Sequence, residues 1–286
     1  MLPVKENSTS ISNRNETEMA KKGGSDPADP WWDWRVHTQS SVAVYAAEAK
    51  EQSDVTEELM QNAIAYNAWL SEAHITLSDP FTGTQIVEKP ELPYASQLAL
   101  DDSGIFAFVE IPKLHVYLPV YHTTSAEVLQ RGAGHMEGTA LPVGGAGNRP
   151  VISAHSGMNW AQMFSDLSDL ETGDLFLIHV LDETLTYQVC DMAVILPEDT
   201  QALVPEKDRD LVSLVTCTPY GINTHRLVVT GERTDETASE HKTEDRVRST
   251  WRHAYLKALL LGFGIAGGAG VMIRILSRHR QKVREQ

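Results

Sequence analysis

The sequence predicts a mainly β domain with short helices, preceded by a helical region. From residue 104 onward, short runs rich in β-branched and aromatic residues alternate with turns that contain Gly, Pro and Asn, as is typical of strands. Before them, apolar residues recur at helical spacing, as at Leu59, Ala63, Tyr66 and Leu70. The 286 residues, 42% of them hydrophobic, suffice for one domain of roughly 150 to 200 residues with extensions.

The chain divides into segments of distinct composition. Residues 1–30 are polar and rich in Ser, Asn, Glu, Lys and Gly, which predicts a disordered N-terminus. Residues 31–100 would hold the helical region, with a helical pattern over 31–70, and residues 101–233 the β domain. We expect strands at 104–111, 116–121, 150–154, 174–180, 184–196, 210–216 and 226–231. Short helices should separate some of these strands, at 125–131 and 160–170.

The C-terminal part predicts a membrane span. Residues 234–253 form a polar linker, and residues 258–273 are an uncharged run. If Lys257 extends its amine towards the membrane surface, the span lengthens to 254–273, close to the ~20 residues that cross a bilayer. Residues 274–286 would then be a basic cytoplasmic tail. A buried or interfacial glycine-rich helix is the alternative.

The charge of the chain argues against one class of partner. The net charge is −15, whereas binding to nucleic acid needs clustered Lys and Arg on the binding domain. The basic tail carries +4, which leaves −19 for residues 1–273. We therefore expect no nucleic-acid partner.

One cysteine and one arginine lie on neighbouring predicted strands, where they could form part of a catalytic site. Cys217 ends the strand expected at 210–216, and Arg226 begins the next strand after a turn that contains Pro, Gly and Asn. A thiol becomes a strong nucleophile only as a thiolate, which a nearby cation or histidine promotes. The guanidinium of Arg226 presents a rigid fork of donors, which suits it to hold a carbonyl or an oxyanion.

A histidine should supply the base. Val151-Ile-Ser-Ala-His155-Ser-Gly157 places His155 at the end of a short apolar strand and before a turn. His225 adjoins Arg226, and adjacent residues of a strand face opposite sides, so we expect it to point away from the site. We interpret the remaining histidines near the strands as surface or packing residues, namely His115, His122 and His135.

These segments resemble the signature of the sortases, the cysteine transpeptidases of Gram-positive cell surfaces. The segment from Val215-Thr-Cys217 to Arg226 is similar to the sortase nucleophile and arginine strands, and the His155 segment resembles Thr-Gly-His-Ser/Arg-Gly. Ala154 departs from the more frequent glycine. Residues 111–122 and 132–145 are similar to the pilin-polymerising class, called class C, and the likeness runs with gaps from about residue 63 to 233. The resemblance implies an eight-stranded sortase-type β-barrel.

The tripeptide Asp79-Pro80-Phe81 extends the resemblance upstream of the barrel. Class C sortases have an Asp-Pro-aromatic lid over the active site, which implies that Asp79 pairs with Arg226 and that Phe81 lies against Cys217. Asp-Pro by itself is a common turn signal, so the lid interpretation depends on the rest of the class C pattern.

The resemblance also implies the reaction. Cys217 would attack a Leu-Pro-x-Thr-Gly-like sorting signal, Arg226 would stabilise the oxyanion, and His155 would transfer protons. The thioacyl group would then pass to a lysine amine of a pilin subunit, and neither a metal nor an organic cofactor is needed. Partners would be pilins or surface proteins that carry the signal. Further candidates for the substrate pocket are Thr216, Thr218 and Asn223.

Three alternatives stay open. A housekeeping sortase would anchor surface proteins to peptidoglycan with the same three residues, and the lid is the feature against it. A cysteine hydrolase would release the acyl group to water. A non-enzymatic adhesin module would tolerate loss of Cys217.

The sequence also predicts on which side of the membrane the domain lies and whether its two cysteines are reduced. We expect the domain outside the cell, held by the single C-terminal span. Class C sortases usually have an N-terminal apolar segment, and residues 1–30 contain none, so we expect a clipped gene model, an altered upstream reading frame or an unusual export route. A disulfide between Cys190 and Cys217 would consume the nucleophile, so we predict two free thiols, with Cys190 as a packing residue.

Overall fold

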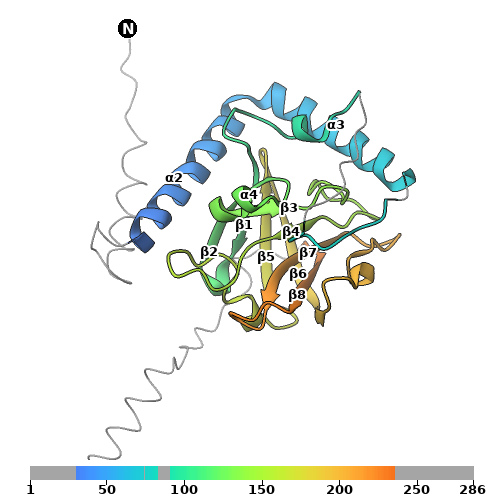
Figure 1. Cartoon of the computed structure of the whole chain (residues 1–286). Coiled ribbons are helices and arrows are strands. Elements are labelled where there is room, and N and C mark those ends of the chain that lie inside the picture. Colours follow the sequence, from blue (N-terminus) through green and yellow to red (C-terminus); the bar gives the residue numbers. More distant parts are fainter. Residues whose placement is uncertain (1–29, 74, 83–90, 236–286) are drawn as a thin grey trace, which may run out of the picture. The chain divides into compact units, whose positions relative to one another are not determined.

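A computed structural model describes residues 30–73, 75–82 and 91–235 (Figure 1). The predicted N-terminal tail up to residue 29 and everything from residue 236 on, including the predicted transmembrane helix, lie outside the described residues. Among the helices that are described, none is both long enough and apolar enough to cross a membrane.

Eight strands close into one barrel, which confirms the expected mainly β domain and the strand number. The strands are β1 Ile105–Ile111, β2 Val116–His122, β3 Ala133–His135, β4 Val151–Ser153, β5 Leu175–Val180, β6 Glu183–Ile195, β7 Leu211–Thr218 and β8 His225–Arg233. Around the barrel their order is β1-β2-β3-β4-β7-β8-β6-β5. The β2–β3 and β4–β7 pairs are parallel, and the other pairs are antiparallel.

The helices differ from expectation in two places. The described α-helices are α2 Pro30–Glu51, α3 Ser53–Glu72 and α4 Ala126–Arg131. The helical pattern at 31–70 is therefore two helices, separated at Gln52. The short 3-10 helices are η1 Tyr94–Ser96, η2 Pro112–Leu114, η3 Leu167–Asp169 and η4 Thr200–Leu203. The helix predicted at 160–170 was wrong except for η3, because the amide of Phe164 bonds to the carbonyl of His155 and not to an earlier residue of a helix.

Single polar side chains fix α2 and α3 to the barrel, and Figure 1 shows both helices along one side of it. The hydroxyl of Tyr45 on α2 donates to the Phe106 carbonyl at 2.7 Å and accepts from the Leu181 amide at 2.8 Å. The amide of Asn67 on α3 exchanges two hydrogen bonds with the backbone of Leu141, at 3.0 and 2.7 Å. All these groups are buried, so each bond satisfies a backbone group that water cannot reach.

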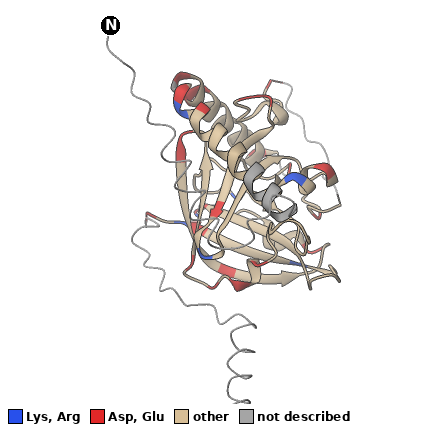
Figure 2. Cartoon of the chain, turned by 90° about the vertical axis from the view of Figure 1, so that its left-hand side faces the viewer, with Lys and Arg blue, Asp and Glu red and all other residues tan. Residues whose placement is uncertain are grey.

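The barrel interior is one large apolar cluster, whose residues lie between Ala63 and Val229 in the sequence. Strand β1 is buried at six of its seven positions, because the core covers one face and α2 part of the other. In Figure 2, where the ribbon is coloured by residue type, acidic residues occur on helices, strands and loops.

Two histidines face each other on adjacent strands, His135 on β3, which is fully buried, and His122 on β2, which is half-buried. His135 Nε2 lies 2.8 Å from the Ala140 carbonyl, so this nitrogen carries the proton and Nδ1 accepts from the Tyr94 hydroxyl at 2.9 Å. His122 Nε2 donates to the Gln97 carbonyl at 2.9 Å. Burial lowers the pKa of both imidazoles to about 4. The sequence predicted surface or packing residues here, and the structure holds both histidines as neutral packing residues.

This cluster should make folding sensitive to acid. The unfolded chain binds a proton on each histidine below about pH 6.5, whereas the folded pKa values are lower, so stability is present above that pH and is lost as pH falls towards 4. Between pH 7 and 5 we expect the free energy of unfolding to drop on the order of 2 kcal/mol for each histidine. Urea unfolding at the two pH values checks this.

The variant His122→Phe supplies the control. It keeps an aromatic ring against Phe106, whose centroid lies 4.5 Å away, and removes one titrating group. The loss between pH 7 and 5 should become smaller by about half of the histidine contribution. An unchanged pH dependence in this variant would contradict the assignment.

Candidate active site

Cys217 near the end of β7 faces Arg226 on β8. The strands are antiparallel, and the Cα atoms of these two residues are partners in the register. Directly opposed residues of such a pair point to the same face, so the thiol and the guanidinium are neighbours. The loop between the strands closes as a turn in which the amides of Ile222 and Asn223 both donate to the Pro219 carbonyl, at 3.0 and 2.9 Å.

His155 comes to the same place from the other side of β7. It follows β4, which pairs in parallel with β7. The Ala154 amide donates to the Val215 carbonyl at 3.1 Å, and the Thr216 hydroxyl donates to the Ala154 carbonyl at 2.8 Å. Two bonds beside His155 therefore tie it to the strand that carries Cys217.

The segment around Asp79 and Phe81 covers this site. Asp79 Oδ1 accepts from Arg226 Nε at 2.8 Å, and Oδ2 accepts from Nη2 at 2.6 Å, which forms a bidentate ion pair. The ring of Phe81 lies 4.9 Å from the Arg226 guanidinium carbon and 6.2 Å from the centroid of the His155 ring. The structure therefore has the ion pair that the resemblance implied, and places Phe81 over the arginine and histidine.

All three nitrogens of the Arg226 guanidinium are already hydrogen-bonded in this arrangement. Nε and Nη2 bind Asp79, while Nη1 donates to the carbonyls of Asn223 and His225, both at 3.1 Å. The arginine is 8% exposed and Asp79 6%, so the pair is shielded from water. An oxyanion on a bound substrate could be held by Nε and Nη2 only after Asp79 has moved.

The pKa values of Cys217 and His155 are shifted in the directions that favour the neutral thiol and the neutral imidazole. Burial raises the pKa of the Cys217 thiol; the charge of Arg226 opposes this shift and the charge of Asp79 adds to it. Burial lowers the pKa of His155. Near pH 7 the covered site therefore favours a neutral thiol beside a neutral imidazole. Asp79 also raises the pKa of Arg226, which stays charged.

An apolar surface lies beneath the covering segment. Leu77 and Phe81 pack against a buried cluster whose members come from β4, β7, β8 and the segments beside them: Met136, Val151, Leu203, Val215 and Val228. Leu203 belongs to η4, in the connection between β6 and β7 (residues 196–210). The hydroxyl of Thr200 donates to the Leu77 carbonyl at 3.5 Å. Removal of the covering segment would expose this surface next to Cys217.

Arg149 holds the β6–β7 connection against the barrel. Its guanidinium donates to the Ser213 hydroxyl at 2.9 Å, the Thr230 hydroxyl at 2.8 Å and the Val204 carbonyl at 3.0 Å. The side chain is 7% exposed, and its nearest carboxylate oxygen, on Glu206, is 3.9 Å away. The connection therefore depends on a buried cation that is bound mainly by neutral oxygens.

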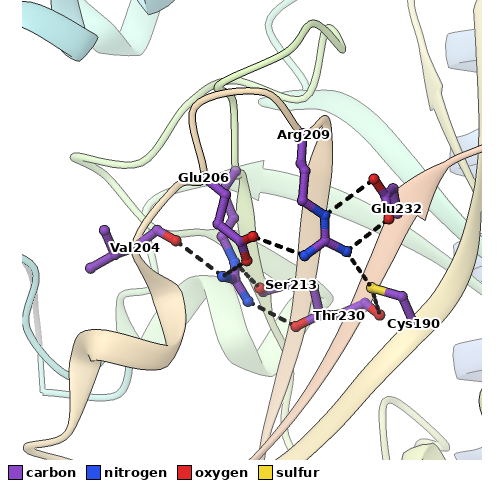
Figure 3. A network of polar contacts seen from close by, with 8 residues as sticks. Cys190, Val204, Glu206, Arg209, Ser213, Thr230 and Glu232 are labelled. Atoms are coloured by element: carbon purple, nitrogen blue, oxygen red, sulfur yellow. Dashed lines mark hydrogen bonds and ion pairs between the residues drawn. The ribbon is translucent and has the colours of Figure 1, made fainter.

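A second arginine continues this network at the surface (Figure 3). Arg209 donates to Glu206 at 2.9 Å and to both carboxylate oxygens of Glu232, at 3.1 and 2.7 Å. It also donates to Cys190 Sγ at 3.4 Å, and this thiol donates to the Thr230 carbonyl at 3.4 Å. Cys190 and Cys217 are both free thiols. Cys190, predicted as a packing residue, is a partly exposed member of this polar network.

The three further pocket candidates have different environments. Thr216 is buried, and its hydroxyl donates to the Ala154 carbonyl. Thr218 is half-buried beside Cys217, and Asn223 is exposed with a φ of 60° and offers its carbonyl to Arg226. His225 points its Nδ1 to the Thr224 hydroxyl at 2.9 Å, away from the pairings of Arg226, as expected from strand alternation.

Sequence reasoning missed two residues around the site, Arg149 and Ser156. Ser156 donates its hydroxyl to the Cys217 carbonyl at 2.7 Å. An arginine directly before a buried strand and a serine directly after the histidine were the available signals. Within the described ranges, no group of three His, Cys, Asp or Glu side chains could hold a metal ion.

A family model and solved structures match this chain. The model described as "Sortase domain" matches residues 109–234. The structure of sortase C-1 from Actinomyces oris is 39% identical, with 63% of this chain and 99% of that chain covered and a TM-score of 0.59. Sortase C from Streptococcus pneumoniae is 36% identical, with 70% and 98% covered and a TM-score of 0.62.

Proteins named sortase A match as well. Sortase A from Corynebacterium diphtheriae is 36% identical, with 71% of this chain and 96% of that chain covered and a TM-score of 0.62. A curated relative, sortase A of Bacillus anthracis, is 25% identical over 152 residues, which are 53% of this chain and 70% of that protein.

The variant Arg149→Met tests the anchoring of the β6–β7 connection. It keeps an apolar stem and leaves the buried Ser213 and Thr230 hydroxyls without their donor, which should lower the free energy of unfolding by on the order of 3 kcal/mol. Arg209→Met is the matched control: its carboxylate partners are 50% and 43% exposed, so it should cost less than about 1 kcal/mol. Chemical denaturation measures both, and equal losses would contradict the anchoring role.

Proposed function

This chain belongs to the sortase family of cysteine transpeptidases, and we propose that it is a pilus-assembling member of that family. In this proposal it cleaves a Leu-Pro-x-Thr-Gly-like sorting signal and joins the new carboxyl end to a lysine amine of a pilin subunit. The observation that carries the proposal is the bidentate contact of Asp79 with Arg226, beside the cross-strand pair of Arg226 and Cys217.

The first half-reaction would form a thioester. The thiol of Cys217 gives its proton to His155 and attacks the Thr–Gly carbonyl carbon, while Nε and Nη2 of Arg226 stabilise the oxyanion that develops. Collapse of this intermediate breaks the Thr–Gly amide bond, and His155 returns the proton to the leaving glycine amine. The reaction needs no change of oxidation state.

The second half-reaction would transfer the acyl group. A lysine amine attacks the thioester carbonyl, His155 accepts a proton from that amine, and the proton passes to the departing thiolate of Cys217. The product is an isopeptide bond.

The lid favours the pilus role over a housekeeping role. Solved relatives include a structure titled "Pilus-related Sortase C of Group B Streptococcus" and one from Streptococcus pneumoniae whose title names pilin substrate specificity. Another relative is a lid mutant of Corynebacterium diphtheriae sortase A. A housekeeping sortase that anchors surface proteins to peptidoglycan is the second candidate, supported by the match to sortase A of Bacillus anthracis.

We propose a cell-surface location, anchored by the span at 254–273. Its support is the uncharged run at 258–273 and the basic residues that follow it in the sequence. Extraction of membranes with alkaline carbonate tests the anchor, since an integral protein stays in the membrane pellet.

Weakening the lid should make the thiol more reactive. In a Cys190→Ala background only Cys217 can be alkylated, and Phe81→Ala should raise its alkylation rate by iodoacetamide about tenfold, as expected if the covering contact is worth about 1.4 kcal/mol. Intact mass spectrometry follows the reaction, with Cys217→Ala as the blank. An unchanged rate would show that the ring does not restrict access to the thiol.

Removal of the negative charge of Asp79 should shift the pH dependence of Cys217 alkylation. Asp79 raises the pKa of Cys217, so Asp79→Asn should lower that pKa and move the alkylation profile towards lower pH. The thiolate form is gained as pH rises through the pKa, so the variant should react faster than the parent at neutral pH and equally fast at high pH. A profile that moves to higher pH would contradict the electrostatic role.

Acceptor preference separates the proposed function from its alternatives. The full chain would be incubated with a Leu-Pro-x-Thr-Gly peptide and either a pilin fragment that contains lysine or a peptidoglycan stem peptide. Ligation to the pilin lysine is expected. Ligation to the stem peptide alone would identify the housekeeping role, and release of free acid with both acceptors would identify a hydrolase.

A further inference from the structure

The parallel pairing of β4 with β7 stops one hydrogen bond before Cys217. Its register pairs Val151 with Ser213 and Ser153 with Val215. The Ala154 amide makes the last backbone bond of the ladder, to the Val215 carbonyl at 3.1 Å. Two residues further along each strand, the same ladder would join the amide of residue 156 to the carbonyl of Cys217.

The side chain of Ser156 makes that bond. Its hydroxyl donates to the Cys217 carbonyl at 2.7 Å. The backbone meanwhile leaves the sheet: the His155 carbonyl accepts from the Phe164 amide at 3.0 Å, and the Gly157 amide donates to the Ser165 hydroxyl at 2.9 Å. Because the Ser156 hydroxyl makes this bond in place of the Ser156 amide, the chain can leave the sheet here and still be hydrogen-bonded to β7.

The turn after Ser156 depends on glycine and on the β7–β8 loop. Gly157 has a φ of +78°, and a Cβ placed there would lie 2.7 Å from the ring of Tyr220. The Tyr220 hydroxyl donates to the Gly157 carbonyl at 3.4 Å. The loop after the histidine and the loop after the cysteine are thus in contact next to the Ser156 bond, at Gly157 and Tyr220.

We propose that Ser156 is a positioning residue that sets the place of the His155 imidazole relative to the Cys217 thiol. The inference rests on the proposed roles of these two residues. His155 lies between two attachments to β7, the Ala154 bonds on one side and the Ser156 hydroxyl on the other. With the second attachment removed, the histidine keeps only one, and a misplacement near 1 Å can lower a rate about 100-fold.

The variant Ser156→Ala should lower the rate of acylation 10- to 100-fold while KM for the peptide stays within about twofold, because the hydroxyl is directed at the backbone of Cys217 and not at substrate. Ser156→Thr keeps a hydroxyl and should restore most of the rate. Ser153→Ala is the matched control, since the Ser153 hydroxyl on β4 is buried and has no hydrogen-bond partner. It should leave the rate unchanged. Equal rates in wild type and Ser156→Ala would overturn the proposal.

A second measurement does not need the sorting peptide. In the Cys190→Ala, Phe81→Ala background, the pH dependence of Cys217 alkylation is recorded for the parent, His155→Ala and Ser156→Ala. The profile of Ser156→Ala should move towards that of His155→Ala. If it matches the parent while His155→Ala differs, Ser156 has no positioning role and the proposed function stands. If His155→Ala itself matches the parent, the imidazole does not influence the thiol and the positioning proposal fails, while the acceptor experiment still tests the proposed function.

Discussion

Closure of the barrel puts β7 between β4 and β8, and the site depends on this constraint. A strand in that position receives a parallel neighbour on one edge and an antiparallel neighbour on the other. The parallel neighbour ends just before His155, and the antiparallel neighbour carries Arg226 opposite Cys217. Three residues that are up to 71 positions apart in sequence are therefore brought together by the pairing of one strand. Changes to the ladder would disturb His155 and Cys217 together.

The buried pair of Asp79 and Arg226 connects this geometry to control of activity. A bidentate carboxylate is the partner that best matches a guanidinium, and an oxyanion on substrate would need the same two donors. The two ligands are mutually exclusive. Burial chiefly, and the charge of Asp79 in addition, raise the pKa of the Cys217 thiol, so the covered site favours the protonated thiol while the carboxylate occupies the two guanidinium donors. Asn67 before the lid and Tyr94 after it are hydrogen-bonded to Leu141 and His135, which ties the flanking segments to the barrel domain.

Much of the barrel could be predicted because six of its eight strands have six or more residues, many of them β-branched. The three-residue strand β3, Ala-Gly-His, could not, since it has too few residues to show alternation and contains a glycine. Cys217, His155 and Arg226 were accessible because each stands at a strand end with a recognisable motif. Arg149 and Ser156 were not, because their importance lies in the partners they reach: hydroxyls of β7 and β8 for the arginine and a backbone carbonyl of β7 for the serine. Such partners are defined by register, which composition does not reveal.

The neutral state of the covered thiol has a consequence for chemical durability. Peroxide oxidises the thiolate of cysteine much faster than the thiol, and the first product, a sulfenic acid, can proceed to forms that are not reversed. Burial and the charge of Asp79 keep Cys217 protonated, while Phe81 lies over the neighbouring histidine and arginine. The segment that covers the site would thus also keep the sulfur of Cys217 in the form least prone to oxidative loss.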